Sequence, residues 1–313
     1  MNPVSTLLTV LWIYTGLFIL LLIADIFKHR KTMEKSPVTG SVLISIIANF
    51  FDTLGIGSFA TATSAWKLTG TNSDDLIPGT LNVAFAIPTA VEATIFIRRI
   101  NMDIPTLILM IAASVIGASI SAKLILRLNI LKIRIVIGAA LLAVAAITLC
   151  KINAVGPFGI IGTAKGLDGS MLLAAILGNL FLGALMPAGV GLYAPCMALI
   201  LLLGMSADAA FPVMMGSCAF LMPSAGISFI KEGRYHRKSA VPMSLGGTLG
   251  VLAAGSVVTA LPLTLMTYLT CIVMVICAGM FFHDAWKHSR LKAARNCRPG
   301  FKITASRNPT KGR

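Results

Sequence analysis

The chain has 313 residues, of which 57% are hydrophobic and 12% charged, and it carries a formal net charge of +15. A soluble domain carries about 25% charged residues, so this composition excludes a soluble enzyme, a disordered chain and a secreted disulfide scaffold. Apolar runs recur along the chain, each near the length of about 20 residues that an α-helix needs to cross a bilayer. The sequence therefore predicts an all-α, polytopic integral membrane protein with about eight to nine transmembrane segments.

The first predicted element is a transmembrane helix followed by a basic loop, in residues 1–37. Its apolar run, Thr6 to Phe27, precedes the basic stretch Lys28 to Lys35. A secretory signal peptide has its positive charge before a shorter apolar stretch, so we expect this helix to be retained. Because Lys and Arg collect in cytoplasmic loops, we expect the N-terminus outside and the basic stretch in the cytoplasm.

An internal repeat follows, at an offset of 134 residues. The stretch Leu54 to Ala60 aligns with Ala188 to Ala194 without a gap, and in the same register Ser73 to Pro78 aligns with Ala207 to Pro212. Chance matching of common membrane residues is the alternative explanation. The residues that recur identically are Gly55, Gly57, Ala60, Asp74 and Pro78, as Gly189, Gly191, Ala194, Asp208 and Pro212.

The repeat divides the chain into two homologous units. Each unit has a long apolar segment, a short loop with the Asp, a helix that starts at the Pro, a basic loop and two more helices. Proline is tolerated at a helix start because its missing N–H would be unpaired there. The predicted segments are 38–150 for unit one, 151–169 for a linker, 170–283 for unit two and 284–313 for a basic cytoplasmic tail.

The long apolar segments are predicted to be discontinuous helices. Val38 to Trp66 has 29 residues and Ser170 to Gly204 has 35, whereas one crossing needs about 20. Glycine and proline in the middle of each segment permit a break. Paired breaks at matching places in two repeats are typical of a transporter binding site; close helix packing through small residues is the alternative. The breaks are predicted at Gly55 and Gly57, and at Pro187, Gly189 and Gly191.

Charge predicts a cytoplasmic C-terminus. With every segment counted as one crossing, 21 of the 26 Lys and Arg residues lie in the cytoplasm. The exceptions are Lys67 and a cluster of four from Lys123 to Arg134. Under this count the two units have the same orientation. If the long segments are re-entrant, the units are inverted, and the sequence leaves both arrangements open.

At these residues the chain resembles the sulfite exporter TauE/SafE family, also called the toluene sulfonate uptake permease family. The resemblance covers about Ser41 to Phe282 and lies in the stretches Phe51 to Gly57, Ile77 to Val83 and Pro187 to Gly191. Unit two departs from it, with Met214-Met215-Gly216 where unit one has Thr80-Leu81-Asn82. The resemblance implies transport of small anions, such as sulfite, sulfonates or carboxylates, across the bacterial inner (cytoplasmic) membrane.

Two carboxyl groups lie inside apolar segments, Asp52 and Glu92. Such groups are costly in a membrane and indicate function, so both are candidates for coupling transport to protons. The alternatives are that Asp52 caps the second half-helix and that Glu92 pairs with Arg98 or Arg99. The candidate substrate-binding residues are Asp52, Thr53, Gly55, Gly57, Ser58, Asn82, Pro187, Gly189, Gly191 and Tyr193.

The predicted function is secondary transport of a small anion (sulfite, an organosulfonate or a related sulfur or carboxylate compound). Helix N-termini and hydroxyls would bind it, because no Lys or Arg lies deep in the long segments. An intramembrane lipid-modifying enzyme and a non-transporting assembly subunit are the alternatives. We expect no catalytic residue, metal or cofactor, and no nucleic-acid partner. Anionic lipids are the expected partners of the basic tail.

Overall fold

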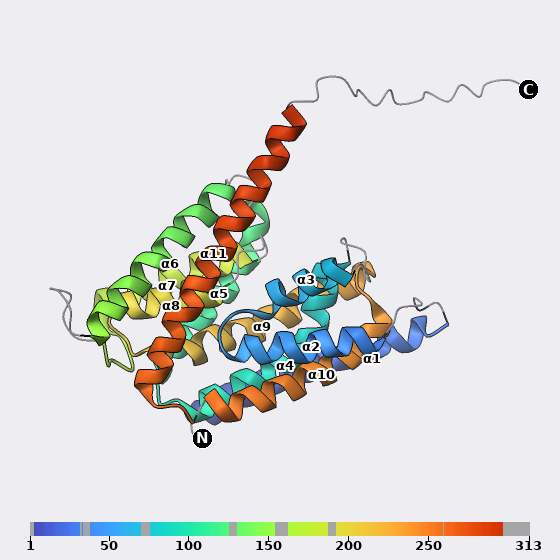
Figure 1. The fold of residues 1–313 in the computed structure, drawn as a ribbon. Helices are drawn as coiled ribbons and strands as arrows, with labels where there is room; N and C mark the ends of the chain where they lie inside the picture. The colour runs from blue at the N-terminus through green and yellow to red at the C-terminus, as the bar shows by residue number, and fades with distance from the viewer. Residues whose placement is uncertain are drawn as a thin grey trace, which may run out of the picture.

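The computed structural model shows a helical membrane protein, and it describes most of the chain. The helices are labelled in Figure 1. The described residues are 3–31, 33, 38–69, 76–124, 130–153, 162–186, 192–258 and 260–296. Within them the helices are α1 (Pro3–His29), α2 (Val38–Thr53), α3 (Ser58–Thr69), α4 (Ile77–Arg99), α5 (Ile104–Leu124), α6 (Ile130–Ile152), α7 (Gly169–Leu185), α8 (Tyr193–Leu202), a 3-10 turn η3 (Ala207–Ala209), α9 (Ala210–Glu232), α10 (Arg237–Val258) and α11 (Leu263–Asn296).

Six helices of the described chain are long and apolar enough to cross a membrane. The chain is therefore a multi-pass membrane protein, as its composition predicts, while the eight or nine crossings expected from the sequence stay a prediction. Four shorter apolar helices accompany the six: Val38–Thr53, Ile104–Ile120, Gly169–Leu185 and Tyr193–Leu202. The six long spans are Pro3–His29, Ile77–Arg99, Leu131–Ile152, Ala207–Glu232, Arg237–Val258 and Thr264–Lys287.

Two ends of the bundle are recognised by their polar contacts. At the first, which we call the basic end, Asp25 near the end of α1 accepts hydrogen bonds from Tyr235 (2.6 Å), which lies between α9 and α10, and from Arg237 (2.7 Å), the first residue of α10. There the backbone N–H of His236 also donates to Thr80 near the start of α4. At the second, the Asp103 end, the N–H of Asp103 before α5 donates to the carbonyl of Lys165 before α7.

The long segment of unit one is broken, as predicted. α2 ends at Thr53 and α3 begins at Ser58. The N–H groups of Gly55 and Ile56 donate to the carbonyls of Asp52 and Phe51, which is the Schellman pattern of a helix C-terminus. That pattern needs a left-handed residue, and Gly55 supplies it with φ +94°. Gly57, with φ +93°, completes the turn.

After the break the chain turns back instead of continuing across. Figure 1 shows α3 returning along the direction from which α2 came. α2 starts at the basic end, where Ser45 donates to the carbonyl of Met243, six residues into α10. The next helix, α4, starts at the basic end too, through Thr80. α2 and α3 therefore form a hairpin that enters from the basic end.

The corresponding segment of unit two forms a second hairpin, from the opposite end. α7 begins at the Asp103 end, where Leu167 and Thr106 bond to each other. α8 ends there too, because Met205 pairs with Ala164 as a parallel bridge. The predicted break residues between α7 and α8, at 187–191, lie outside the described residues.

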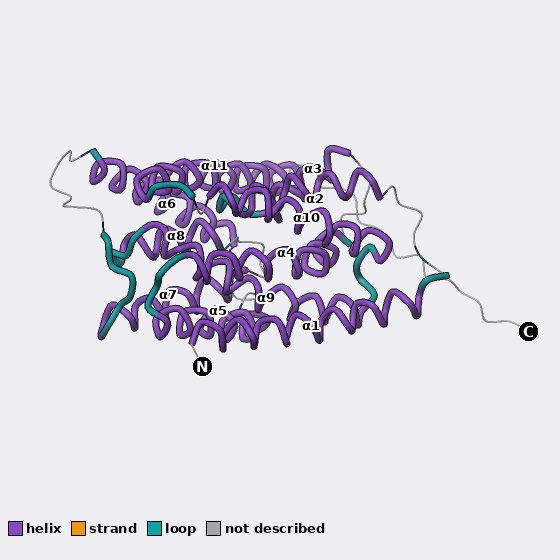
Figure 2. The backbone as a smooth tube through the Cα atoms, turned by 90° about the horizontal axis from the view of Figure 1, so that it is seen from below, coloured by secondary structure: helices purple, strands orange, loops and turns teal. Residues whose placement is uncertain are grey.

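Figure 1 shows the helices in two groups inclined to each other, with α1 to α4, α9 and α10 in one and α5 to α8 and α11 in the other. Within the first group α4 packs on α9 and α10 on α2; within the second α5 packs on α7 and α6 on α11. α4 and α9 are stacked through Phe96 and Phe211, whose ring centroids are 5.0 Å apart. Figure 2 shows α11 and α1 at opposite edges of the molecule.

The helix pairs α2–α10 and α5–α7 cross in equivalent ways. A Cβ on Gly250 of α10 would overlap the carbonyl of Ile46 in α2, and a Cβ on Gly117 of α5 would overlap the carbonyl of Leu180 in α7. Ile46 and Leu180 are 134 positions apart, and Gly117 and Gly250 are 133 apart. The spacings of the residues at the two close crossings thus match the offset of the predicted repeat to within one residue.

Candidate functional site

The two hairpins meet at a buried polar cluster. We call Asp52, Thr53, Ser58, Glu92 and Tyr193 the central cluster. They come from α2, α3, α4 and α8, and each is at most 5% exposed. All five are sequence-predicted site or coupling residues. The structure therefore brings together residues separated by up to 141 positions along the chain.

Asp52 binds the start of α3. The backbone N–H of Ser58 donates to Asp52 Oδ1 at 2.7 Å, and the Ser58 hydroxyl donates to Oδ2 at 2.9 Å. Ser58 is the first residue of α3, and the first N–H groups of a helix have no partner within it. The carboxylate thus takes the place of a helix cap, which is the alternative role that the sequence offers for this residue.

Glu92 lies opposite, on α4, and is bonded by Tyr193. The Tyr193 hydroxyl donates to Glu92 Oε2 at 3.1 Å, while Glu92 Oε1 is buried and has no hydrogen-bond partner. Within the described chain Glu92 makes no ion pair, so it does not pair with Arg98 or Arg99. Asp52 is near enough to interact electrostatically with both Glu92 and Tyr193.

Tyr193 is the first residue of α8, as Ser58 is the first residue of α3. The two half-helices thus both begin at the central cluster and direct their N-termini toward it. A helix N-terminus carries free N–H groups and a partial positive charge. At α8 no side chain caps the described N-terminus, whereas at α3 Asp52 does.

The wall beside the first break is rich in sulfur. A Cβ added to Gly55 would overlap the terminal methyl of Met197 and would approach that of Met214 at 3.6 Å. Cys218 lies within electrostatic reach of Asp52 and Glu92. Sequence reasoning missed Cys218 and both methionines, because in an apolar run these residues are indistinguishable from ordinary packing residues.

The other predicted residues lie at or away from the cluster. Gly55 and Gly57 form the turn beside Asp52. Asn82 lies ten residues before Glu92 on α4, and its amide donates to the carbonyl of Pro78 in its own helix at 2.8 Å. The structure therefore does not bring Asn82 to the central cluster. Pro187, Gly189 and Gly191 fall outside the described residues.

Chemically, the central cluster is acidic and is shielded from solvent. Two carboxyl groups and a phenol can accept and release protons, and a protonated carboxyl has an O–H that can donate a hydrogen bond. No described Lys, Arg or His forms an ion pair with either carboxyl group. In comparisons with known proteins, the chain matches no family model, no curated protein and no solved structure.

Proposed function

We propose that the chain is a secondary transporter that moves a small anion across the membrane together with protons. The observation that supports this most is the convergence of two half-helix N-termini on two buried carboxyl groups. Broken helices at membrane depth are found where they line a site, and ionisable groups there mark transport paths or proton relays. The proton carriers are Asp52 and Glu92, with Tyr193 bonded to the second.

An anion fits this site only when the carboxyl groups are protonated. Ionised Asp52 and Glu92 would repel it, and the α3 N-terminus is already occupied by Asp52. Protonation converts each carboxyl group from an acceptor into a donor and removes the repulsion. The α8 N-terminus then contributes N–H groups and partial positive charge. Proton binding and anion binding are therefore linked, as symport requires.

We also propose that the two units are inverted repeats. The hairpins enter from opposite ends, and the helix pairs α2–α10 and α5–α7 repeat one crossing. Inverted repeats around a central site can exchange conformations, which opens the site to each side in turn. The resemblance to the sulfite exporter TauE/SafE family suggests sulfite, an organosulfonate or a carboxylate as the substrate.

In this arrangement the basic end faces the cytoplasm, with the N-terminus outside and the C-terminus inside. This arrangement assigns to the cytoplasmic side the adjoining ends of α5 and α6, which carry Lys123, Lys132 and Arg134. Lys and Arg are favoured on that side. The sequence count with one crossing per segment left this cluster outside. Re-entrant hairpins thus remove the main exception to that count. Among the described residues, the Lys and Arg that remain outside are Arg98, Arg99, Lys151 and Lys165.

The proposal is tested with purified protein in liposomes carrying an imposed pH difference. Uptake of labelled sulfite, thiosulfate, organosulfonates and carboxylates is measured for the wild type, Asp52→Asn and Glu92→Gln. The amides keep hydrogen-bonding capacity but carry no exchangeable proton. We expect the wild type to accumulate at least one of these anions, and we expect each variant to lose proton-driven accumulation while it keeps downhill exchange.

Asp284→Asn is the matched control, because this exposed carboxylate, 53% accessible, lies on α11 away from the cluster. It should accumulate substrate as the wild type does. Accumulation by both Asp52→Asn and Glu92→Gln at the wild-type level would end the proton-carrier role. If the wild type moves no anion of the panel under any gradient, the transport proposal itself is wrong.

A further inference from the structure

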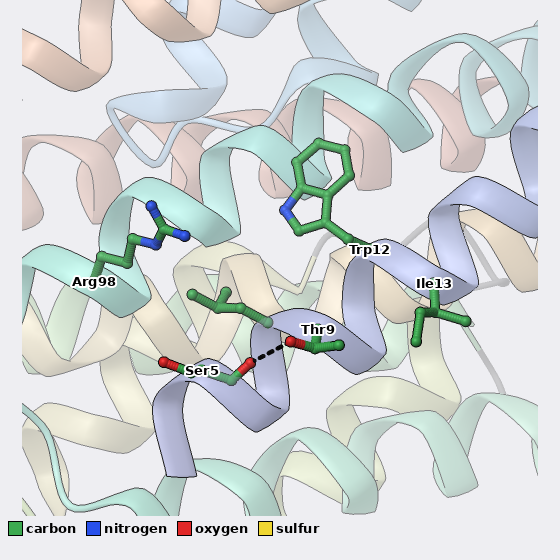
Figure 3. A pocket seen from close by; sticks show the side chains of 6 residues that line it. Ser5, Thr9, Trp12, Ile13 and Arg98 are labelled. Carbon is green, nitrogen blue, oxygen red and sulfur yellow. Dashed lines mark hydrogen bonds between the residues drawn. The ribbon is translucent and has the colours of Figure 1, made fainter. Parts of the chain in front are cut away.

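A groove lies at the Asp103 end of the first helix group, away from the central cluster. It is formed where the start of α1 lies beside the end of α4, and its volume is about 450 Å³. Figure 3 shows Arg98 of α4 on one side of it and Ser5 and Thr9 of α1 on the other. The residues that line it are Ser5, Leu8, Thr9, Trp12, Ile13 and Arg98.

The groove lies at the depth of lipid headgroups. Arg98 is the last residue but one of α4, and Ser5 is the third residue of α1. Both helices span the membrane by length and composition, so these positions fall at the membrane–water interface. Trp12 lies seven residues further along α1, about 10 Å deeper than Ser5, and donates to Thr94 of α4 at 3.0 Å.

The polar side of the groove is suited to an anion. Arg98 is exposed, and it forms no ion pair among the described residues. Among the residues that the structure describes, no acidic side chain lines the groove. At the basic end, by contrast, the Arg237 guanidinium is paired with Asp25. A guanidinium binds phosphate oxygens through two parallel N–H groups.

The apolar side of the groove continues along α1. Ile13, Leu17 and Leu20 lie on one stripe of the helix, and 57 to 65% of their surface is exposed. In a membrane helix such residues face lipid chains. An acyl chain seated on this stripe would place its headgroup at Ser5 and Arg98.

We propose that this groove binds an anionic phospholipid, whose phosphate contacts the Arg98 guanidinium and whose acyl chain lies along α1. The charge, the absence of an acidic residue from the lining and the apolar stripe each fit one part of such a molecule. The site is separate from the central cluster. Its existence does not depend on what the protein transports.

Lipid binding to the full-length protein in neutral detergent is the test. Phosphatidylglycerol and the zwitterionic phosphatidylcholine are titrated, and bound lipid is counted by native mass spectrometry. We expect phosphatidylglycerol to bind more tightly, and Arg98→Gln to weaken it about tenfold, as expected when one charge-assisted contact is lost. Arg98→Lys should retain part of the preference for phosphatidylglycerol over phosphatidylcholine, because it keeps the positive charge but not the planar pair of guanidinium N–H groups.

Arg99→Gln is the matched control, since Arg99 is adjacent in sequence but does not line the groove. It should bind phosphatidylglycerol as the wild type does. Equal losses in Arg98→Gln and Arg99→Gln would show a diffuse charge effect and overturn the site. Displacement of the lipid by equimolar glycerol phosphate would show a free-anion site without an acyl component, which also contradicts the proposal. Helical circular dichroism verifies that each variant is folded.

Discussion

At the scale of single residues, Asp52 has two separable tasks in the proposed transporter. It binds the first N–H of α3 through Ser58, and it carries a proton. Asn at position 52 can perform the first task, because Asn and Asp cap helices about equally well. Ala can perform neither.

We therefore expect Asp52→Ala to lower the free energy of unfolding by about 1–3 kcal/mol, the cost of leaving buried donors unpaired. Asp52→Asn should lower it by less than half as much. Thermal unfolding in detergent measures both. If Asp52→Ala melts with the wild type, the contact with Ser58 does not stabilise the α2–α3 hairpin.

Substitutions at Gly55 and Gly57 distinguish the cost of backbone conformation from the cost of a steric overlap. Both have positive φ, yet a Cβ on Gly55 would overlap Met197 while one on Gly57 has nothing within 4 Å. We expect the left-handed backbone to lower the free energy of unfolding of both Ala variants by about 1–2 kcal/mol. Gly55→Ala should lower it further, because its Cβ also overlaps Met197. Stability and transport are measured for each. A Gly57→Ala variant as damaged as Gly55→Ala would show that Met197 moves aside freely.

The central cluster shows what sequence reasoning reaches and what it misses. Gly55 and Gly57 were predicted at a break, and they lie at one, because only glycine adopts their backbone angles readily. The contact between Glu92 and Tyr193 joins positions 101 residues apart. No local pattern encodes such a distance, so the sequence could name both residues but not their pairing. Asn82, a predicted site residue in the stretch Ile77 to Val83, has its amide bonded within its own helix.

At the scale of helices, the crossings α2–α10 and α5–α7 depend on glycine at the contact. Gly250 and Gly117 let the backbones approach until a Cβ would overlap a carbonyl of the facing helix. Backbone atoms cannot move aside as a side chain can. Small residues serve this purpose in membrane helix pairs generally.

We expect Gly250→Leu and Gly117→Leu each to lower the free energy of unfolding by about 2 kcal/mol or more, the usual cost of overpacking, and to abolish transport. Gly279→Leu is the control, because a Cβ there has nothing within 4 Å. Expression, monodispersity and melting temperature are compared. Wild-type behaviour of Gly250→Leu would mean that α2 and α10 are not packed as described.

Helix length could be read from the sequence, but the direction of the half-helices could not. A segment of 29 residues, Val38 to Trp66, is too long for one crossing and fits either a broken crossing or a hairpin. The choice rests on tertiary contacts: Ser45 with Met243 at the basic end, and Met205 with Ala164 at the Asp103 end. These partners lie in other helices or distant loops, which hydrophobic periodicity does not identify.

At the scale of the whole molecule, the hairpin arrangement makes a topology prediction that differs from continuous crossings. In the hairpin arrangement Lys132, near the start of α6, lies on the cytoplasmic side, and Lys151, at its end, lies outside. Continuous crossings place them the other way round. We expect Lys132→Cys to react with a membrane-impermeant thiol reagent only from inside.

The measurement uses right-side-out and inverted vesicles and a background without Cys150 and Cys297. Lys151→Cys is the matched variant and should react from outside. Labelling of Lys132→Cys in right-side-out vesicles would contradict the inverted arrangement. Reporter fusions at the two termini test the remaining assignment, with Arg313 expected inside and Asn2 outside.

The contact of α1 with the α9–α10 junction joins the first helix to the rest of the bundle. Asp25 accepts from Tyr235 and Arg237, and burial together with the Asp25 carboxylate raises the pKa of Tyr235 above its ordinary value. The phenol therefore stays a donor throughout the physiological pH range. Asp25→Asn should lower the melting temperature by several degrees, because it leaves Arg237 without its counter-charge. An unchanged melting temperature would show that α1 is held by its apolar contacts alone.

The opposite entry of the two hairpins has a consequence for biosynthesis. In the inverted arrangement that we propose, the two similar predicted units enter the membrane in opposite orientations during synthesis. The distinguishing signal lies in loop charge: Lys123, Lys132 and Arg134 flank the α5–α6 junction, while the matching junction between α10 and α11, residues 259–262, has no charged residue. In that arrangement, a few Lys and Arg residues at these junctions are enough to set the orientation of each predicted unit, because Lys and Arg are retained on the cytoplasmic side.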